Sequence, residues 1–159
     1  MKPTVYIAAP FFTQSQLERI NYIELLCDKY NWFDYYSPRK FFVLKPDSEV
    51  YDQKKVFDSN LQFIKNSQIM IAIVDEPDTG THWEMGYAYG IGKQVIMVMI
   101  DKDKTNVMLS MSCTGVLKSR EKIESFLIGK DYGYAYNEIN GRTIDFNWGV
   151  LEKWNGKVY

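Results

Sequence analysis

Short runs of apolar residues alternate along this chain with longer segments in which apolar residues recur every three or four positions. Residues 69–74 form a continuous apolar run rich in β-branched side chains, and a second run covers residues 95–100. Continuous runs of this length are typical of strands that are buried on both faces of a sheet. A further strand is expected at the start of residues 5–12, which run directly into a turn.

The segments between these runs have the pattern of helices. A helix is predicted to open at Thr13, because Gln16 follows it at the spacing of a capping box. A second helix is expected after Asp52, and a last one over residues 119–127. Apolar residues recur at helical spacing in the first two helices: Leu17, Ile20, Ile23 and Leu26, then Val56, Phe57, Leu61 and Ile64.

This order of elements predicts one domain over residues 1–159, with an α/β fold. We expect a doubly wound, flavodoxin-like and mostly parallel sheet that is flanked by helices. The length of 159 residues and the 46% hydrophobic content allow a core of useful size.

Composition excludes several kinds of partner. The net charge is only -1, so we expect no nucleic-acid polymer as a partner. Cys27 and Cys113 are the only cysteines, and they suit neither a disulfide framework nor a metal pair. The apolar runs are too short to span a bilayer, and the N-terminus lacks the pattern of a signal peptide. We therefore expect a cytoplasmic protein with no membrane contact.

The most informative segment is 75–93, DEPDTGTHWEMGYAYGIGK, which lies between the two apolar runs. Thr81 and Glu84 have the spacing of a capping box, which predicts that a helix opens at Thr81 and ends near Gly90 and Gly92. The loop before this helix would lie at the carboxyl end of a parallel strand. Open α/β sheets bind ligands at that edge. The glycines match neither a P-loop nor GxGxxG, so a phosphate cradle is excluded.

Two carboxylates, Asp78 and Glu84, lie in this segment. Glu84 could simply cap its helix, and Asp78 could be an ordinary turn residue. In the alternative interpretation, the positive end of the helix dipole keeps Glu84 ionised in the first turn, so that it can act as a nucleophile. One carboxylate of a pair could attack an electrophilic carbon while the other assists a leaving group, as in retaining glycosyl transfer.

Several stretches match a known pattern of residues. They are residues 5–12 (Val-Tyr-Ile-Ala-Ala-Pro-Phe-Phe), 37–39 (Ser-Pro-Arg), 57–61 (Phe-Asp-Ser-Asn-Leu) and 78–88 (Asp-Thr-Gly-Thr-His-Trp-Glu-Met-Gly-Tyr-Ala), followed by Gly92-Lys93. Weaker matches are Asn106 near Met108, and residues 156–159 at the end. Together they resemble the nucleoside 2-deoxyribosyltransferase family over nearly the whole chain.

The resemblance implies a role for each matching residue. Glu84 would attack the anomeric carbon of the deoxyribose and hold the sugar as an ester, Asp78 would assist departure of the base, and Tyr6 would orient Glu84. The substrates would be a deoxynucleoside donor and a free nucleobase acceptor, with no cofactor and no metal. Residues expected to contact substrate are Phe11, Phe12, Asn60, Gly80, Asn106, Met108 and Tyr159.

The resemblance also implies an oligomer, since Asn106 and the carboxylate of Tyr159 match groups that family members supply to a neighbouring subunit. Phe11 and Phe12 would form an apolar wall against the base.

The chain departs from the family pattern in three places. Asn60 stands where the family has an Asp, which changes a charged acceptor into an amide with donors. The region of Arg39 and Lys40 lacks a base-contacting Gln that one branch of the family has. Residues 129–142 form a polar and aromatic insertion that could be a lid or a subunit contact.

Two other functions suit the same residues. A hydrolase of deoxynucleosides or their monophosphates would use both carboxylates but admit water to the ester. A non-catalytic nucleotide-binding module would keep the pocket without turnover.

Overall fold

The computed structural model of the chain describes residues 2–129, 137–139, 142–144 and 146–159. Most of the insertion at 129–142 lies outside the described residues. The main sheet of the described part has five parallel strands in the order β2-β1-β3-β4-β6. They are β1 (Thr4–Ala8), β2 (Asp34–Tyr36), β3 (Ile69–Ile73), β4 (Gln94–Val98) and β6 (Gly115–Leu117).

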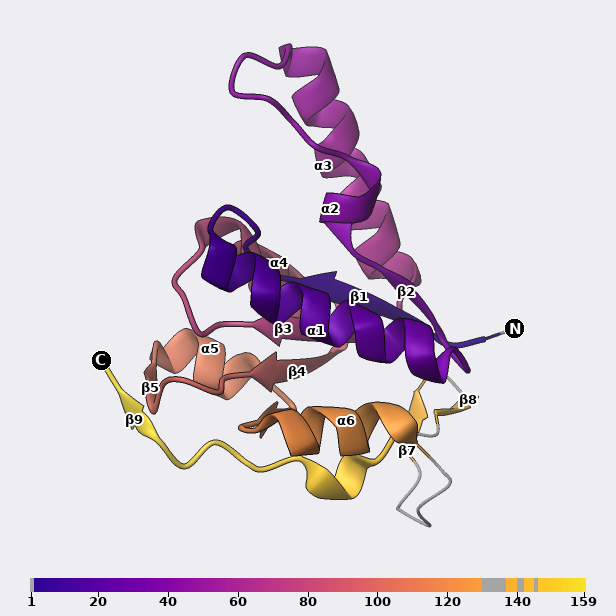
Figure 1. Cartoon of the computed structure of the whole chain (residues 1–159), viewed down its shortest axis with the longest axis vertical. Coiled ribbons are helices and arrows are strands. Elements are labelled where there is room, and N and C mark those ends of the chain that lie inside the picture. The colour runs from indigo at the N-terminus through magenta and orange to yellow at the C-terminus, as the bar shows by residue number, and fades with distance from the viewer. Residues whose placement is uncertain (1, 130–136, 140–141, 145) are drawn as a thin grey trace.

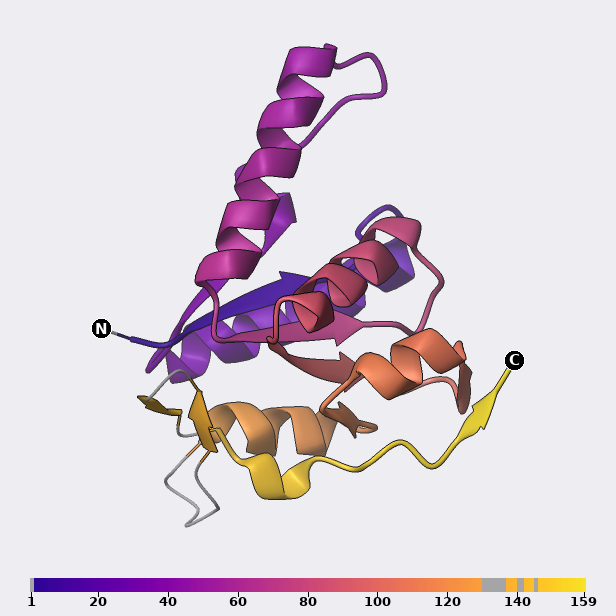
Figure 2. The same ribbon diagram turned by 180° about the vertical axis from the view of Figure 1, so that it is seen from behind.

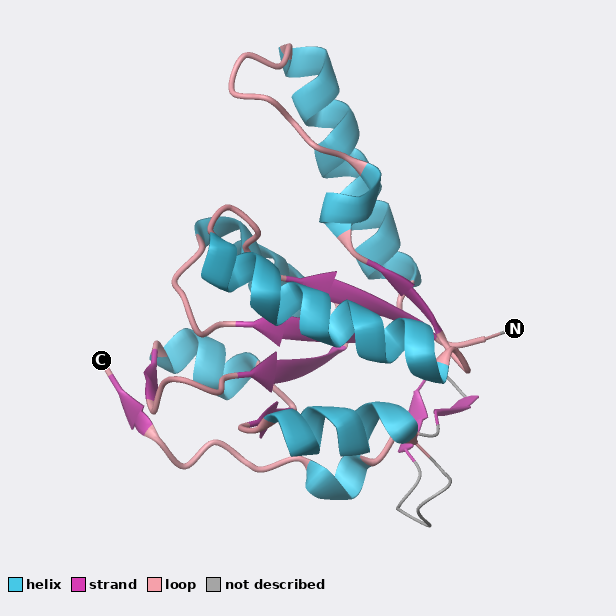
Figure 3. Cartoon of the chain, viewed as in Figure 1, coloured by secondary structure: helices cyan, strands magenta, loops and turns pink. Residues whose placement is uncertain are grey.

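Helices cover both faces of this sheet (Figures 1 and 2). Helices α1 (Gln14–Tyr30) and α6 (Arg120–Ile128) pack on one face, and α4 (Thr79–Gly90) and α5 (Val107–Ser112) pack on the other. Figure 3 shows the strands of the main sheet at the centre of the body with helices outside them. The predicted doubly wound, mostly parallel α/β fold is confirmed.

The core has two halves because successive residues of a strand point to opposite faces. On β1, Val5 and Ile7 face α1 and α6, whereas Tyr6 and Ala8 face α4. The five residues of β3 are all buried, and they divide between the two halves in the same way. The continuous apolar runs therefore mark strands that are covered on both sides, as predicted. The alternation also directs the side chain of Tyr6 towards α4.

Helix α1 begins as predicted. Thr13 caps it, and both hydrogen bonds of the capping box with Gln16 are present. The predicted last helix is α6, which Ser119 caps. The prediction for α3 was less accurate, because α3 (Val50–Asn66) begins before Asp52.

Helix α3 and the short α2 (Pro38–Phe41) project from the body (Figure 1, top). The far end of α3 leaves Val50 and Tyr51 about three-quarters exposed. The near end packs against the sheet and α4 through Ile64, which is buried. The apolar residues of α3 thus divide between the core and an exposed surface.

The C-terminal segment runs back along the body to the carboxyl edge of the sheet. After the 3-10 helix η2 (Trp148–Val150), it ends in β9 (Lys157–Val158), which pairs with β5 (Lys104–Thr105). A separate hairpin joins β7 (Asn137–Ile139) and β8 (Arg142–Ile144). Within the described ranges, no helix is long and apolar enough to cross a membrane.

Candidate active site

Helix α4 carries the two candidate carboxylates, and Asp78 caps it. Oδ2 of Asp78 accepts hydrogen bonds from the backbone N–H and the hydroxyl of Thr81, each at 2.7 Å. The helix therefore begins at Thr79, and the predicted start at Thr81 is wrong. Asp78 and Thr81 have the same three-residue spacing as Thr81 and Glu84, and it is Asp78 that caps the helix through Thr81. Glu84 lies in the second turn and is free of any capping role.

Glu84 is hydrogen-bonded to Tyr6 across the interface between α4 and β1. The hydroxyl of Tyr6 donates to Oε1 of Glu84 at 2.8 Å. Tyr6 is completely buried, and it lies on β1, which pairs with β2 on one side and with β3 on the other. A buried donor on a rigid strand fixes the orientation of the carboxylate that it contacts.

Burial raises the pKa of Glu84 to about 7, although the hydrogen bond from Tyr6 acts in the opposite direction. The negative charge of Asp78 also raises this pKa. The helix dipole was expected to favour the ionised form of Glu84, but the pKa is raised because the loss of solvation has the larger effect. Burial and the charge of Glu84 raise the pKa of Tyr6 far above its usual value, so Tyr6 stays protonated and donates.

Glu84 lies in a pocket of about 320 Å³ between α3 and α4. The volume is at the lower end of the range for small-molecule sites. The lining residues are Phe57, Asn60, Leu61, Ile64, Gly80, Trp83 and Glu84. Two of the predicted substrate-binding residues, Asn60 and Gly80, are thus beside Glu84.

Phe57 and Trp83 are aromatic residues of this pocket that the sequence did not single out. Their ring centroids are 5.5 Å apart. Both residues are about half exposed, Phe57 at 49% and Trp83 at 51%. Phe57 lies three residues before Asn60 on α3, and Trp83 precedes Glu84. That helical spacing was the signal that could have found Phe57.

Phe11 and Phe12, which were expected to form the apolar wall, do not line the Glu84 pocket in this chain. Phe11 packs against the core half beneath α1. Phe12 is 74% exposed, and its backbone N–H donates to Gln16.

Asn106, Met108 and Tyr159 come together in a second pocket of about 570 Å³. Oδ1 of Asn106 accepts from the backbone N–H of Met108 at 2.8 Å, which caps α5. The backbone N–H of Tyr159 donates to the carbonyl of Thr105 at 3.2 Å. Trp83 lines both pockets and separates these three residues from Glu84.

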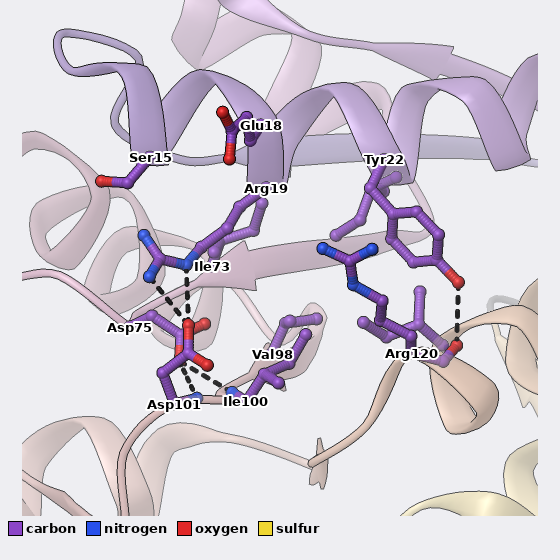
Figure 4. A pocket seen from close by; sticks show the side chains of 12 residues that line it. Ser15, Glu18, Arg19, Tyr22, Ile73, Asp75, Val98, Ile100, Asp101 and Arg120 are labelled. Atoms are coloured by element: carbon purple, nitrogen blue, oxygen red, sulfur yellow. Dashed lines mark hydrogen bonds and ion pairs between the residues drawn. The ribbon is translucent and has the colours of Figure 1, made fainter.

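A third and smaller hollow, of about 140 Å³, lies between α1 and α6 on the other face of the sheet (Figure 4). Two of its charged side chains, Arg19 and Arg120, contact neighbouring groups. Arg19 pairs with Glu76 at 2.6 Å and with Asp101 at 2.8 Å. The guanidinium of Arg120 lies 4.9 Å from the ring centroid of Tyr22. These contacts join α1 to the loops after β3 and β4, and they belong to the packing of the fold.

A model of the nucleoside 2-deoxyribosyltransferase family matches residues 5–141. The chain therefore belongs to this family. No curated protein sequence is similar enough to add to this comparison.

Solved structures agree with the family. A 2-deoxyribosyltransferase from Bacillus psychrosaccharolyticus is 26% identical with a TM-score of 0.71, over 77% of this chain and 91% of that one. A conserved protein from Enterococcus faecalis V583 is 22% identical with a TM-score of 0.56, over 100% of this chain and 91% of that one. A CMP N-glycosidase from Clostridium botulinum is 20% identical with a TM-score of 0.50, over 74% of this chain and 92% of that one. The last two support the fold alone.

Proposed function

We propose that this protein transfers a 2-deoxyribosyl group from a deoxynucleoside to a free nucleobase through an ester on Glu84. The observation that carries the proposal is the hydrogen-bonded pair of Tyr6 and Glu84 beside a pocket of aromatic residues, in a chain of this family. The half-exposed rings of Phe57 and Trp83 offer flat apolar surface to a base.

In the first step, an oxygen of ionised Glu84 attacks the anomeric carbon. The bond from that carbon to the base nitrogen breaks, and its electron pair leaves with the base. With a pKa of about 7, roughly half of the Glu84 side chains are ionised at neutral pH. Tyr6 holds the carboxylate in one orientation, which reduces the entropy lost in reaching the transition state.

Asp78 handles the proton. A nitrogen anion is a poor leaving group. In the reactive form Glu84 is ionised and Asp78 carries a proton, which it gives to the base nitrogen as the base departs. In the second step, the acceptor base attacks the same carbon, the ester oxygen leaves as the Glu84 carboxylate, and the acceptor gives a proton to Asp78. Oδ2 of Asp78 is occupied by Thr81, so Oδ1 is the oxygen assigned to this exchange.

We also propose a homo-oligomer in which Asn106, Met108 and Tyr159 complete the Glu84 pocket of a neighbouring subunit. Met108 is 75% exposed and Tyr159 is 79% exposed. Neither residue lines the Glu84 pocket of its own chain. Pairing of β9 with β5 holds Tyr159 in place. No cofactor or metal is part of the proposal.

Hydrolysis is the alternative, with water in place of the acceptor base. The fold is compatible with it, since the CMP N-glycosidase shares that fold. A panel of deoxynucleoside donors and free bases, analysed by chromatography, separates the functions. We expect base-exchanged nucleosides. Free base and deoxyribose without exchange would support the hydrolase, and measurable binding without turnover would support a binding module.

A further inference from the structure

Among the described residues that line the Glu84 pocket, the side chains with hydrogen-bonding groups are Glu84, Asn60 and Trp83, and Trp83 has only an indole N–H donor. The rest of the lining is aromatic, aliphatic or glycine. Apolar walls bind any base of suitable size, whereas polar groups distinguish one base from another. Since Trp83 is proposed to offer its ring face to the base, Asn60 is the neutral side chain in this pocket that is suited to the hydrogen-bonding edge of the base.

The amide of Asn60 is held in one orientation by Tyr36. The hydroxyl of Tyr36 donates to Oδ1 of Asn60 at 3.2 Å. Tyr36 is only 1% exposed, and its ring stacks on Tyr6 and Phe63, with centroid distances of 5.6 and 3.6 Å. Burial and the charge of Glu84 raise the pKa of Tyr36 to about 12, so its hydroxyl keeps its proton at neutral pH.

This contact determines what Asn60 can offer to a ligand. An amide has an acceptor oxygen and a donor nitrogen. Because Oδ1 already accepts from Tyr36, the N–H groups on Nδ2 are left for the pocket. An aspartate at this position would offer acceptors alone.

We infer that Asn60 selects bases that carry a carbonyl group over bases that carry an exocyclic amine at the same ring position, and that Tyr36 is the positioning residue for this selection. The inference rests on the proposed function, because it takes the ligand of the Glu84 pocket to be a nucleoside. The N–H of Asn60 donates to the carbonyl oxygen. An exocyclic amine would face a donor with its own donor, and one hydrogen bond would be lost.

Two nucleoside pairs carry this difference: deoxyuridine with deoxycytidine, and deoxyinosine with deoxyadenosine. Calorimetry measures the dissociation constants in a Glu84→Ala background, because no turnover consumes the ligand there. The nucleoside pair that binds more tightly is used for the comparison. This background also removes the charge of Glu84 from the neighbourhood of residue 60. We expect the carbonyl nucleoside to bind about three- to tenfold more tightly, the value of one neutral hydrogen bond.

Two further substitutions in this background test the mechanism of selection. Asn60→Asp should reverse the preference, because a carboxylate accepts from the amine. Tyr36→Phe keeps the stacked ring but frees the amide to rotate, so the preference should shrink towards equal binding. The matched controls are Asn66→Asp on the exposed side of α3 and Tyr35→Phe on β2, whose hydroxyl contacts Asp28. Both controls should keep the preference.

Equal binding of the two nucleosides, tighter binding of the amine, or a preference unchanged by Asn60→Asp would each overturn the inference. So would the absence of binding by either pair. A preference that survives Tyr36→Phe would overturn the role of Tyr36. Failure of the proposed function is a separate result: a wild-type chain with the expected binding preference but no turnover of any nucleoside would contradict transfer and leave the selection intact.

Discussion

Tyr6 in the middle of β1 and Glu84 in the second turn of α4 are 2.8 Å apart, hydroxyl to carboxylate, although 78 positions separate them in the chain. The pair links the central sheet to the helix that carries the reactive group. Two opposing effects meet at Glu84, since burial favours the neutral acid and the hydrogen bond from Tyr6 favours the carboxylate. Together these effects give Glu84 a pKa of about 7. Part of the enzyme therefore carries the ionised nucleophile at neutral pH.

Removing the hydroxyl of Tyr6 should alter the pH dependence of the reaction. In Tyr6→Phe, the pKa of Glu84 should rise above its value of about 7, because the hydrogen bond that lowers it is gone. The acidic limb of the kcat/KM profile should move to higher pH by about one pH unit. Activity should fall more at pH 6.5 than at pH 8.5. The control is Tyr35→Phe, and identical profiles for the wild type and Tyr6→Phe would contradict the assignment.

Glu84 should also make the stability of the fold depend on pH. Its pKa is 4.5 in an ordinary environment and about 7 in the fold. Between these values the unfolded chain releases a proton that the folded chain retains, so stability falls as the pH rises, and the full cost is present above pH 7. Glu84→Gln removes this titration.

The stability of Glu84→Gln relative to the wild type should therefore be greater at pH 8 than at pH 4, by on the order of 3 kcal/mol in the free energy of unfolding. Urea denaturation at both pH values measures this difference. Glu18→Gln, at an exposed position on α1, should show no such change with pH. A free-energy difference between Glu84→Gln and wild type that is the same at pH 4 and pH 8 would show that Glu84 has an ordinary pKa.

Asp78 combines a structural role with the proposed chemical one, and substitutions can separate them. Asn caps helices as well as Asp does, so Asp78→Asn should fold normally and lose about 100-fold or more in kcat. Asp78→Ala should lose the cap as well, at a cost of about 1 kcal/mol in stability. The defect of Asp78→Asn should shrink for 5-fluorodeoxyuridine, whose base is a better leaving group than uracil. Equal defects with both substrates would exclude proton donation.

Deleting Tyr159 should increase hydrolysis relative to transfer. Tyr159 follows β9 and is 79% exposed, and it is proposed to close a neighbouring pocket. Without it, water competes better for the Glu84 ester, so the ratio of free deoxyribose to exchanged nucleoside should rise. Thymidine with adenine as acceptor gives both products in one chromatogram, and light scattering follows the oligomer. An unchanged ratio would place Tyr159 outside the site.

Local patterns in the sequence predicted strands β1, β3 and β4 and the four longer helices α1, α3, α4 and α6, but not the short elements β2, β6, α2 and α5. Buried strands were visible as apolar runs, and the Thr13 cap was visible because its partner Gln16 is three residues away. The same kind of pattern failed at α4, where Asp78 and Thr81 compete as caps at equal spacing. Only the packed structure determines which of two local hydrogen-bond patterns forms.

Contacts between distant segments could not come from pattern alone. The pairing of Tyr6 with Glu84 followed from the family resemblance, and its effect on the pKa required the burial around it. Aromatic residues gave little guidance, because Phe12 and Phe57 are both apolar but only Phe57 lines the pocket. The contact that orients Asn60 joins β2 to α3, and no sequence spacing indicates it.

Mass spectrometry of a trapped intermediate tests the central claim most directly. A 2-fluoro-deoxynucleoside reacts slowly at the anomeric carbon, so the wild type should gain the mass of one fluorodeoxyribosyl group, and peptide mapping should place it on Glu84. Adding a free base to the isolated adduct should remove the group and yield the matching fluoronucleoside, and Glu84→Ala should form no adduct. An adduct on another residue, or an adduct that water releases while no added base accepts the sugar, would contradict transfer through Glu84.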